Sequence, residues 1–481
     1  MAVQLTDDQI RQIARRVAAT LSGSRAGAPS PERPLDPGRL VEGVFADMDA
    51  AVRAAAEAQR SLVAMTMAQR DKIVARLRAV MLEHAESLAG EALAETGLGR
   101  LEDKTAKNRL VAEKTPGTEV LTPMARTGDR GLSLFEPAPY GVIGAITPVT
   151  NPTSTIICNT IGMLAAGNGV VFNVHPAAKT VSIRTVHLIN RAIVEAGGPP
   201  NVVTTLAEPT IESAQNLMKH PGVRLLVVTG GAGVVEVAMR SGKRAICAGP
   251  GNPPVVVDET ADLEQAGRDI VRGASFDNNI VCVCEKEVLA VASISDGLAK
   301  SLRRHGAVIL TAPQLRQLER VLFPKGAPPG SPAEVDKSLI GKHADAILSR
   351  IGLRVGPEIR LVVAETDIQH PLVWTEQMMP VLPLVKVATA DEGIDLAQRV
   401  EQGLRHTAVM HSKNLDHLSR MARVMDCSIF VKNGPAYAGL GFGGEGYASF
   451  SIASPTGEGL TGPRQFSRER RCVLVDHFRI V

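Results

Sequence analysis

The chain alternates short apolar runs with longer amphipathic stretches. Between residues 141 and 247, runs of four to six mostly apolar residues are separated by segments in which apolar side chains recur every three or four positions. The runs predict buried strands and the segments predict helices, an order typical of a parallel sheet covered on both faces. The predicted strands are 141–146, 169–174, 202–206, 224–228 and 244–247, and the predicted helices are 152–166, 182–196, 211–218 and 233–241.

A second block with the same alternation begins near residue 263. Its predicted helices are 263–275, 293–305, 391–402 and 415–425, and its predicted strands are 285–290, 361–363, 407–411 and 428–431. Helical patterns rich in Ala, Leu and Arg precede the first block at 47–59, 67–85 and 87–96. A chain of 481 residues is too long for one hydrophobic core. We therefore expect an α/β fold with two Rossmann-type parallel-sheet domains in series.

The first 21 residues predict a short amphipathic helix. Thr6 followed three positions later by Gln9 is a capping-box signal, and apolar side chains then share one helical face at Ile10, Ile13, Val17 and Leu21. Residues 22–39 are rich in Ser, Gly, Ala and Pro and predict a flexible linker. A tethered helix without a core of its own is expected to dock on a partner, or else to fold back on the main body.

Composition excludes several classes of function. The formal net charge of +3, from 53 basic and 50 acidic residues, is too balanced for a nucleic-acid or membrane surface. Aromatic residues make up only 3%, which disfavours base stacking, and no apolar run approaches the roughly 20 residues that span a bilayer. Six cysteines without a paired framework indicate reduced thiols in an intracellular setting.

A run of small and polar residues, 273–282, ends in a thiol. Asn278 and Asn279 suit a tight loop that lifts the Cys282 side chain away from a helix end. A nucleophilic cysteine needs such an approach path, together with donors for the oxyanion that forms. Cys284 lies two positions later, which leaves a metal or redox pair as an alternative, but the six thiols lack zinc-like spacing and we predict no metal.

Asn151 follows a predicted strand and precedes a helix that begins at Pro152. Its amide therefore lies at the carboxyl end of a strand, where open α/β sheets bind their ligands. There it can donate a hydrogen bond to an oxyanion, or it can cap the following helix, as asparagine also does well. Thr150 is the alternative residue for the cap.

A glycine-rich turn, residues 229–233, ends one predicted strand and opens a helix with Val234 in its first turn. Small residues allow a pyrophosphate to approach a helix N-terminus. Any strand-to-helix turn can be glycine-rich, so the turn is a weak signal by itself, and the G-x-G-x-x-G dinucleotide fingerprint is absent from the sequence.

Three segments together carry a family resemblance: 147–153 (TPVTNPT), 248–253 (AGPGNP) and the thiol run 273–282. They resemble the aldehyde dehydrogenase superfamily, in its CoA-acylating branch. The likeness extends from about Leu40 to the C-terminus, and further motifs resemble the CoA-acylating aldehyde dehydrogenases of bacterial microcompartments: 102–104, 115–117, 432–435, 443–446 and 455–459.

The resemblance implies a set of roles. Cys282 is the nucleophile, and Asn151 donates to the oxyanion, although Thr150 occupies the superfamily's usual slot for that asparagine. NAD is the expected cofactor, with His175 in place of the usual ribose-binding lysine, Gly231 in the serine position of a Thr-Gly-Ser turn, and Glu376 holding the nicotinamide ribose. The expected cofactor-binding residues are Thr147, Pro148, His175, Pro176, Gly230, Gly231, Val234, Gly249 and Glu376.

One expected residue is missing. Hydrolytic relatives carry a glutamate before Leu-Gly-Gly that activates water, and this chain has Ala248 there. Water, with a pKa of about 15.7, needs a base, whereas a thiol with a pKa of about 8.5 is partly ionised at neutral pH. We therefore expect transfer of the acyl group to CoA, with a short aldehyde, propionaldehyde before acetaldehyde, as substrate. The alternatives are a hydrolytic dehydrogenase, or an inactive scaffold that binds partners through residues 1–21.

The resemblance also implies an organisation and a location. We expect an NAD-binding domain at 40–256 with an oligomerisation hairpin at 126–140, a catalytic thiol domain at 257–440 and a C-terminal oligomerisation segment at 441–481. The N-terminal helix resembles the tag that docks such enzymes to shell proteins. The expected state is a homodimer or homotetramer inside a cytoplasmic microcompartment.

Overall fold

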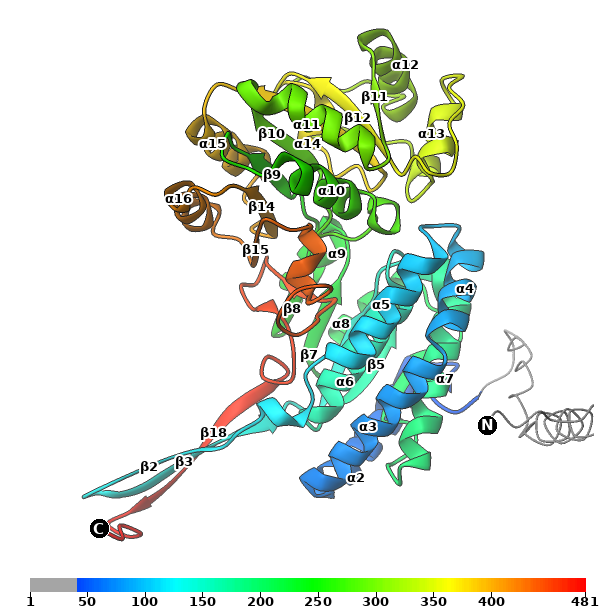
Figure 1. Cartoon of the computed structure of the whole chain (residues 1–481). Coiled ribbons are helices and arrows are strands. Elements are labelled where there is room, and N and C mark those ends of the chain that lie inside the picture. Colours follow the sequence, from blue (N-terminus) through cyan, green and yellow to red (C-terminus); the bar gives the residue numbers. More distant parts are fainter. Residues whose placement is uncertain (1–40) are drawn as a thin grey trace, which may run out of the picture. The chain divides into compact units, whose positions relative to one another are not determined.

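The computed structural model describes residues 41–481, drawn in colour in Figure 1. The predicted docking helix at 1–21 and the predicted linker at 22–39 lie outside the described residues. Among those described, no helix is both long and apolar enough to cross a membrane.

Four helices precede the first sheet. The start of α2 is capped by Asp47, whose side chain accepts from the Ala50 N–H, and the start of α3 by a capping box of Thr66 and Gln69. The left-handed Gly97 ends α4. The bounds are α2 (Met48–Ala64), α3 (Met67–Glu83), α4 (Ala85–Thr96), α5 (Leu101–Lys114) and the 3-10 turn η1 (Thr118–Val120). The pattern predicts the first three of these helices but not α5.

The first sheet is six-stranded and parallel, in the order β1-β6-β5-β4-β7-β8. Its strands are β1 (Val44–Phe45), β4 (Val142–Ile146), β5 (Gly169–Asn173), β6 (Val203–Leu206), β7 (Val223–Thr229) and β8 (Ala245–Ala248). The connections are α6 (Pro152–Ala165), η2 (Pro176–Ala178), α7 (Lys179–Glu195), α8 (Ile211–Lys219) and α9 (Ala232–Met239). Strand β4 alternates its side chains between two cores, one shared with α6 and α7 and the other with α2, α8 and α9.

The strand order reverses at β4, because the chain runs outward through β5 and β6 and then returns to place β7 on the other side. In open α/β sheets, ligands bind at such a switch point, outside the carboxyl ends of the strands. The residues that follow β4 and β7 therefore flank the expected ligand crevice.

The second sheet is seven-stranded and parallel, in the order β11-β12-β13-β10-β9-β14-β15. Its strands are β9 (Pro254–Val257), β10 (Glu287–Val291), β11 (Ala307–Leu310), β12 (Leu361–Thr366), β13 (Val381–Val387), β14 (Thr407–His411) and β15 (Ile429–Lys432). The pattern predicts β10, β12, β14 and β15 but not β9, β11 and β13. Two Rossmann-like parallel sheets thus confirm the predicted fold class.

Helices cover both faces of the second sheet, α10 and α11 on one and α15 and α16 on the other. The helices are α10 (Leu263–Ala274), α11 (Ala292–Arg304), α12 (Ala312–Leu322), α13 (Ala344–Ser349), α14 (Pro371–Trp374), α15 (Ala390–Val400) and α16 (Leu415–Met425). The 3-10 turns are η3 (Phe276–Asn279), η4 (Lys337–Leu339) and η5 (Ala436–Leu440). One continuous apolar core contains side chains from both sheets, so the two halves pack directly against each other.

A three-stranded antiparallel sheet is formed by β2 (Met124–Gly128), β3 (Gly131–Pro139) and β18 (Ser467–Val475). Figure 1 shows these strands as an elongated ribbon that ends near the C-terminus. A short antiparallel pair, β16 (Ile452–Ala453) and β17 (Gly459–Leu460), precedes β18. The role of this ribbon in oligomerisation stays a prediction.

Candidate active site

All the residues predicted for the site line one cavity of about 620 Å³. The cavity lies where the carboxyl edge of the first sheet meets the amino edge of the second, because its walls follow β4 and β7 and precede β9 and β10. Residues far apart in the sequence meet there: Cys282, Asn151, Thr147, Pro148, His175, Pro176, Gly230, Gly231, Val234, Gly249 and Glu376.

Cys282 follows a backbone segment in an unusual conformation. Three successive residues of η3, Asp277, Asn278 and Asn279, have φ values of 45°, 53° and 66°, in the left-handed region that non-glycine residues seldom enter. Buried side-chain hydrogen bonds hold this segment. The Asn278 amide donates to the carbonyls of Gly99 and Gly341 at 3.1 and 2.8 Å. The loop that carries the thiol is therefore fixed by its own side chains.

The environment of Cys282 favours the protonated thiol. Burial, followed by the charge of Glu376, raises the pKa of the Cys282 thiol to about 12, and the nearby ammonium groups of Lys286 and Lys107 reduce the shift only in part. Cys282 is nonetheless partly exposed in the cavity wall. The site thus holds an accessible thiol that must lose a proton before it can act as a nucleophile.

Asn151 is the residue that precedes α6, but its side chain makes no capping hydrogen bond to that helix. Instead its Oδ1 accepts a hydrogen bond from Lys107 Nζ at 2.5 Å, and its Nδ2 donates to Thr150 Oγ1 at 3.1 Å. The alternative role as a side-chain helix cap is therefore absent here, and the amide belongs to the cavity wall.

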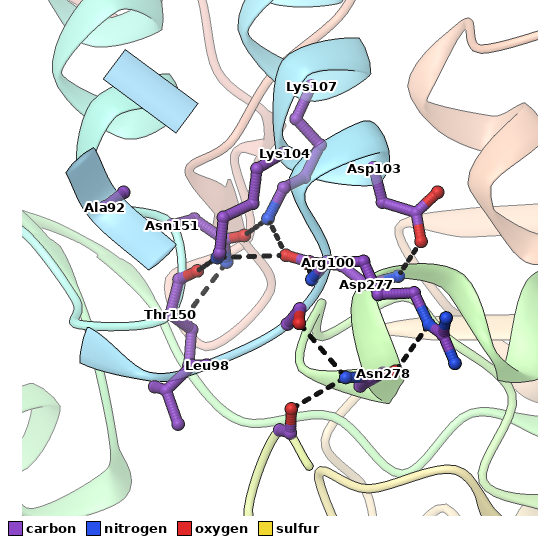
Figure 2. A network of polar contacts seen from close by, with 12 residues as sticks. Ala92, Leu98, Arg100, Asp103, Lys104, Lys107, Thr150, Asn151, Asp277 and Asn278 are labelled. Carbon is purple, nitrogen blue, oxygen red and sulfur yellow. Dashed lines mark hydrogen bonds and ion pairs between the residues drawn. The ribbon is translucent and has the colours of Figure 1, made fainter. Parts of the chain in front are cut away.

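Behind Asn151 lies a cluster that the sequence pattern does not predict. Figure 2 shows Lys104 and Lys107 reaching from α5 toward Asp277, where both form ion pairs with its carboxylate. Lys104 Nζ also donates to the Thr150 carbonyl at 3.3 Å. Burial lowers the pKa of Lys104 to about 8. The three-residue spacing of Lys104 and Lys107 indicates that both lie on one face of a helix, but this spacing does not indicate that the face is buried.

The switch-point crevice has the features of a dinucleotide site. Gly231 is the N-cap residue of α9 and provides no side-chain cap, so the N–H groups of the first turn of α9 remain for a ligand. A Cβ on Gly231 would meet no atom within 4 Å, which shows open space at this turn. Thr147 Oγ1 is buried without a hydrogen-bond partner among residues 41–481. These observations fit a bound pyrophosphate and ribose.

Glu376 is the only carboxylate among the described residues that line the cavity. Its Oε1 accepts a hydrogen bond from the Gly251 N–H at 3.2 Å, and burial raises its pKa. Ala248 is a buried residue at the end of β8, and its carbonyl accepts from the Gly230 N–H at 3.1 Å.

Cys284, the second thiol of the run, and a buried histidine, His411, do not line this cavity. His411 is buried at the end of β14, and burial lowers its pKa to about 4. Cys284 is buried, and its Sγ contacts the Phe276 carbonyl at 3.6 Å. Among the described residues no group of three or more His, Cys, Asp or Glu side chains is placed to hold a metal ion.

Comparisons with known proteins agree with this geometry. The profile of the aldehyde dehydrogenase family matches residues 38–314. The chain is 52% identical to acetaldehyde dehydrogenase (acetylating) EutE of Escherichia coli over 440 residues, which cover 91% of this chain and 94% of that protein. It is 45% identical to propanal dehydrogenase (CoA-propanoylating) of Salmonella typhimurium over 440 residues, 91% of this chain and 93% of that protein.

A solved structure shows the same likeness. The propionaldehyde dehydrogenase of Rhodopseudomonas palustris, with bound CoA and an acylated cysteine, superposes with a TM-score of 0.88 at 51% identity, covering 91% of this chain and 99% of that one. These likenesses span both parallel sheets and the cavity between them. The chain belongs to the aldehyde dehydrogenase family.

Proposed function

We propose that this protein is an NAD-dependent, CoA-acylating aldehyde dehydrogenase that converts a short-chain aldehyde and CoA to an acyl-CoA. Propionaldehyde is the proposed substrate, with acetaldehyde the close alternative, as the names of the relatives support. The observation that carries the proposal is Cys282 and Asn151 in one cavity wall, with alanine at 248 in place of the usual base.

The proposed cofactor site is the switch-point crevice. Gly230, Gly231 and the first turn of α9 would hold the pyrophosphate, and His175 and Glu376 would hold the two riboses. NAD bound there supplies the hydride acceptor. The proposal of NAD over NADP rests on the family resemblance and not on the charges of the cavity wall.

In the proposed reaction, the Cys282 thiolate adds to the aldehyde carbon and forms a C–S bond. The aldehyde oxygen becomes an oxyanion that accepts a hydrogen bond from Asn151 Nδ2. As this adduct collapses, hydride leaves the carbon and a thioester remains on Cys282. The CoA thiolate then adds to the thioester carbonyl and expels Cys282, which gives acyl-CoA and the free enzyme.

The absent base decides between the two possible acceptors of the acyl group. Ionising water at neutral pH without a base is costly, because its pKa is about 15.7, whereas a thiol of pKa about 8.5 is a few per cent ionised. Replacing the glutamate with Ala248 therefore slows hydrolysis far more than it slows transfer to CoA. The thioester on Cys282 therefore persists until CoA reacts with it.

Hydrolysis to a free acid is the second candidate, and one observation favours it. The Glu376 carboxylate lines the same cavity and is close enough to influence the Cys282 thiol, so it could accept a proton from water. However, Glu376 accepts a hydrogen bond from the Gly251 N–H and is the proposed ligand of the ribose, and both contacts compete with a role as the base for water. Mass spectrometry of the product, with and without CoA, separates acyl-CoA from free acid.

The first test is the dependence of NADH formation on CoA. Sustained NADH formation should require CoA, and Cys282→Ala should abolish turnover while NAD binding persists. Cys472→Ser, which alters an exposed thiol in β18, is the matched control and should keep full activity. Free acid formed without CoA at a comparable rate would refute the proposal, and an active Cys282→Ala enzyme would remove Cys282 from the mechanism.

We further propose that residues 1–21 dock the enzyme to the shell of a bacterial microcompartment. The amphipathic pattern of this segment and the Pro- and Gly-containing stretch at 22–39 support this role. Deletion of residues 2–21 should leave kcat/KM unchanged but release the enzyme from purified compartments. A truncated enzyme that still copurifies with shells would contradict this docking role.

The ribbon of β2, β3 and β18 is the proposed contact in a homodimer or homotetramer.

A further inference from the structure

Helix α5 carries two buried lysines whose burial is costly and requires an explanation. Lys104 and Lys107 are only 3% and 2% exposed, although lysine is almost never fully buried unless it is paired. Both ion-pair with Asp277, which is itself completely buried. Two ammonium groups and one carboxylate leave an excess of positive charge inside the protein, and buried charges are costly. A cluster with this cost calls for a role beyond packing.

Asp277 is held in place from several directions. Its Oδ1 accepts a hydrogen bond from the Arg100 N–H at 2.7 Å, and its own N–H donates to Asp103 Oδ2 at 2.9 Å. The turn before α5 approaches so closely that a Cβ on Gly99 would lie 2.0 Å from Asp277 Oδ1. Because Asp277 is five residues before Cys282, this anchor ties α5 to the loop that carries the thiol (Figure 2).

Lys107 contacts Asn151 as well as Asp277. Its Nζ donates to Asn151 Oδ1 at 2.5 Å, and it does not itself line the cavity. In a primary amide the oxygen and the nitrogen point to opposite sides, so a hydrogen bond to the oxygen fixes the direction of the NH₂ group. The flipped amide would set its N–H donors against the ammonium of Lys107. Lys107 therefore selects one orientation of the Asn151 side chain.

We infer that Lys107, anchored by Asp277, is a positioning residue that holds the Asn151 amide with its nitrogen available to the aldehyde oxygen. This inference rests on the proposed function and deepens it. Asn151 follows a strand of the first sheet and Cys282 precedes a strand of the second, and the Asp277–Lys107–Asn151 contacts join the oxyanion donor to the nucleophile loop. Because the Asn151 amide is already oriented, no free energy is spent on reorienting it when the oxyanion forms.

A double-mutant cycle tests this inference. Single-turnover NADH formation, which isolates the acylation steps, is measured for Lys107→Met, Asn151→Ala and the double variant. Loss of one oxyanion donor typically costs about 10²–10³ in rate, so Asn151→Ala should fall in that range and Lys107→Met should lose roughly 10- to 100-fold. If Lys107 acts through Asn151, the double variant should be within about 3-fold of Asn151→Ala.

The control is Arg109→Met, which removes an exposed cation from the same helix two positions away and should keep the wild-type rate. The affinity for NAD should be unchanged in all variants, which a general loss of structure would not allow. Where Lys107→Met does not yield folded protein, Lys107→Leu, which also removes the N–H donor, takes its place in the same cycle.

The outcomes separate this inference from the proposed function. Losses that multiply in the double variant, or a Lys107 variant with the wild-type rate, would overturn the role of Lys107 and leave the proposed reaction intact. Full activity of Asn151→Ala would instead remove the proposed oxyanion donor, and with it the premise of the cycle.

Discussion

At the scale of single residues, the site pairs a thiol with a carboxylate that opposes its ionisation. The charge of Glu376 is the second cause, after burial, of the raised pKa of Cys282. The same glutamate is the proposed ligand of the nicotinamide ribose. Burial and this negative charge together favour the protonated thiol, so Cys282 must lose a proton before it can act as a nucleophile.

This pairing predicts the effect of Glu376→Gln on the thiol. Removing the negative charge should lower the pKa of Cys282, so alkylation by iodoacetamide at pH 8 to 9 should be faster than in the wild type. The pH dependence of the alkylation rate in the ligand-free enzyme measures the shift. Glu259→Gln, at an exposed glutamate, is the control and should leave the profile unchanged. An unchanged or raised pKa in Glu376→Gln would contradict this electrostatic account.

The residues of the site divide into those that sequence could identify and those that it could not. Cys282, Asn151 and Glu376 stand in motifs, and the structure brings them to one cavity. Lys104 and Lys107 have no such signal, because a charged side chain normally indicates a solvated surface. Their burial depends on Asp277, 170 or more positions away, and no local pattern reports a partner at that distance.

At the scale of elements, the N-cap position of α9 affects both the stability of the helix and the binding of an anion. Asp is a better helix N-cap than Gly, and its negative charge interacts favourably with the positive end of the helix dipole. The same position faces the cavity, where the proposed ligand carries a negative pyrophosphate. The glycine at 231 thus gives up some helix stability in favour of an anion.

Substitution of Gly231 should reveal this competition. Gly231→Asp should raise the melting temperature slightly or leave it unchanged, yet raise the Kd for NAD at least 10-fold through charge repulsion. Gly231→Asn is a good cap of similar size without the charge, and it should weaken NAD binding much less. Fluorescence titration and thermal unfolding measure the two effects. Equal weakening by Asp and Asn would indicate steric exclusion and contradict the anion site.

The elements that the pattern misses have physical reasons. Helix α5 lacks an apolar stripe because its inner face carries Lys104, Lys107 and Asn108, which contact polar groups. Strand β13 contains Pro383, a residue that disfavours a central strand, although β13 lies between β10 and β12. Strand β9 begins at Pro254, directly after the Gly- and Pro-containing run 249–253, a composition typical of a loop.

At the scale of the whole molecule, buried carboxyl groups connect folding stability to pH. Burial raises the pKa of Glu285 to about 8 and that of Glu401 to about 7. In an unfolded chain a glutamate has a pKa of about 4.3. Between these values the folded protein retains protons that the unfolded chain releases, so these groups make stability fall as pH rises from about 4.5 to 8.

Glu285→Gln should flatten this fall. The amide oxygen can still accept the hydrogen bond that Glu285 Oε1 receives from the Ala436 N–H at 2.8 Å, but the side chain no longer ionises. Melting temperatures recorded from pH 5 to 8.5 should decline less in Glu285→Gln than in the wild type, whereas Glu259→Gln should follow the wild type. A parallel decline in both variants would show that Glu285 does not ionise in this range.

The antiparallel ribbon has a consequence for how the protein is made. Strand β3 pairs along its length with β18, from Pro139 with Ser467 to Gly131 with Val475. The hairpin of β2 and β3 is translated before most of the helices and strands of both parallel sheets, whereas its third strand, β18, is translated after them. One edge of β3 therefore stays open while both sheets are synthesised, a state prone to pairing with other chains. Completion of this ribbon, and every contact that depends on it, follows the synthesis of both sheets.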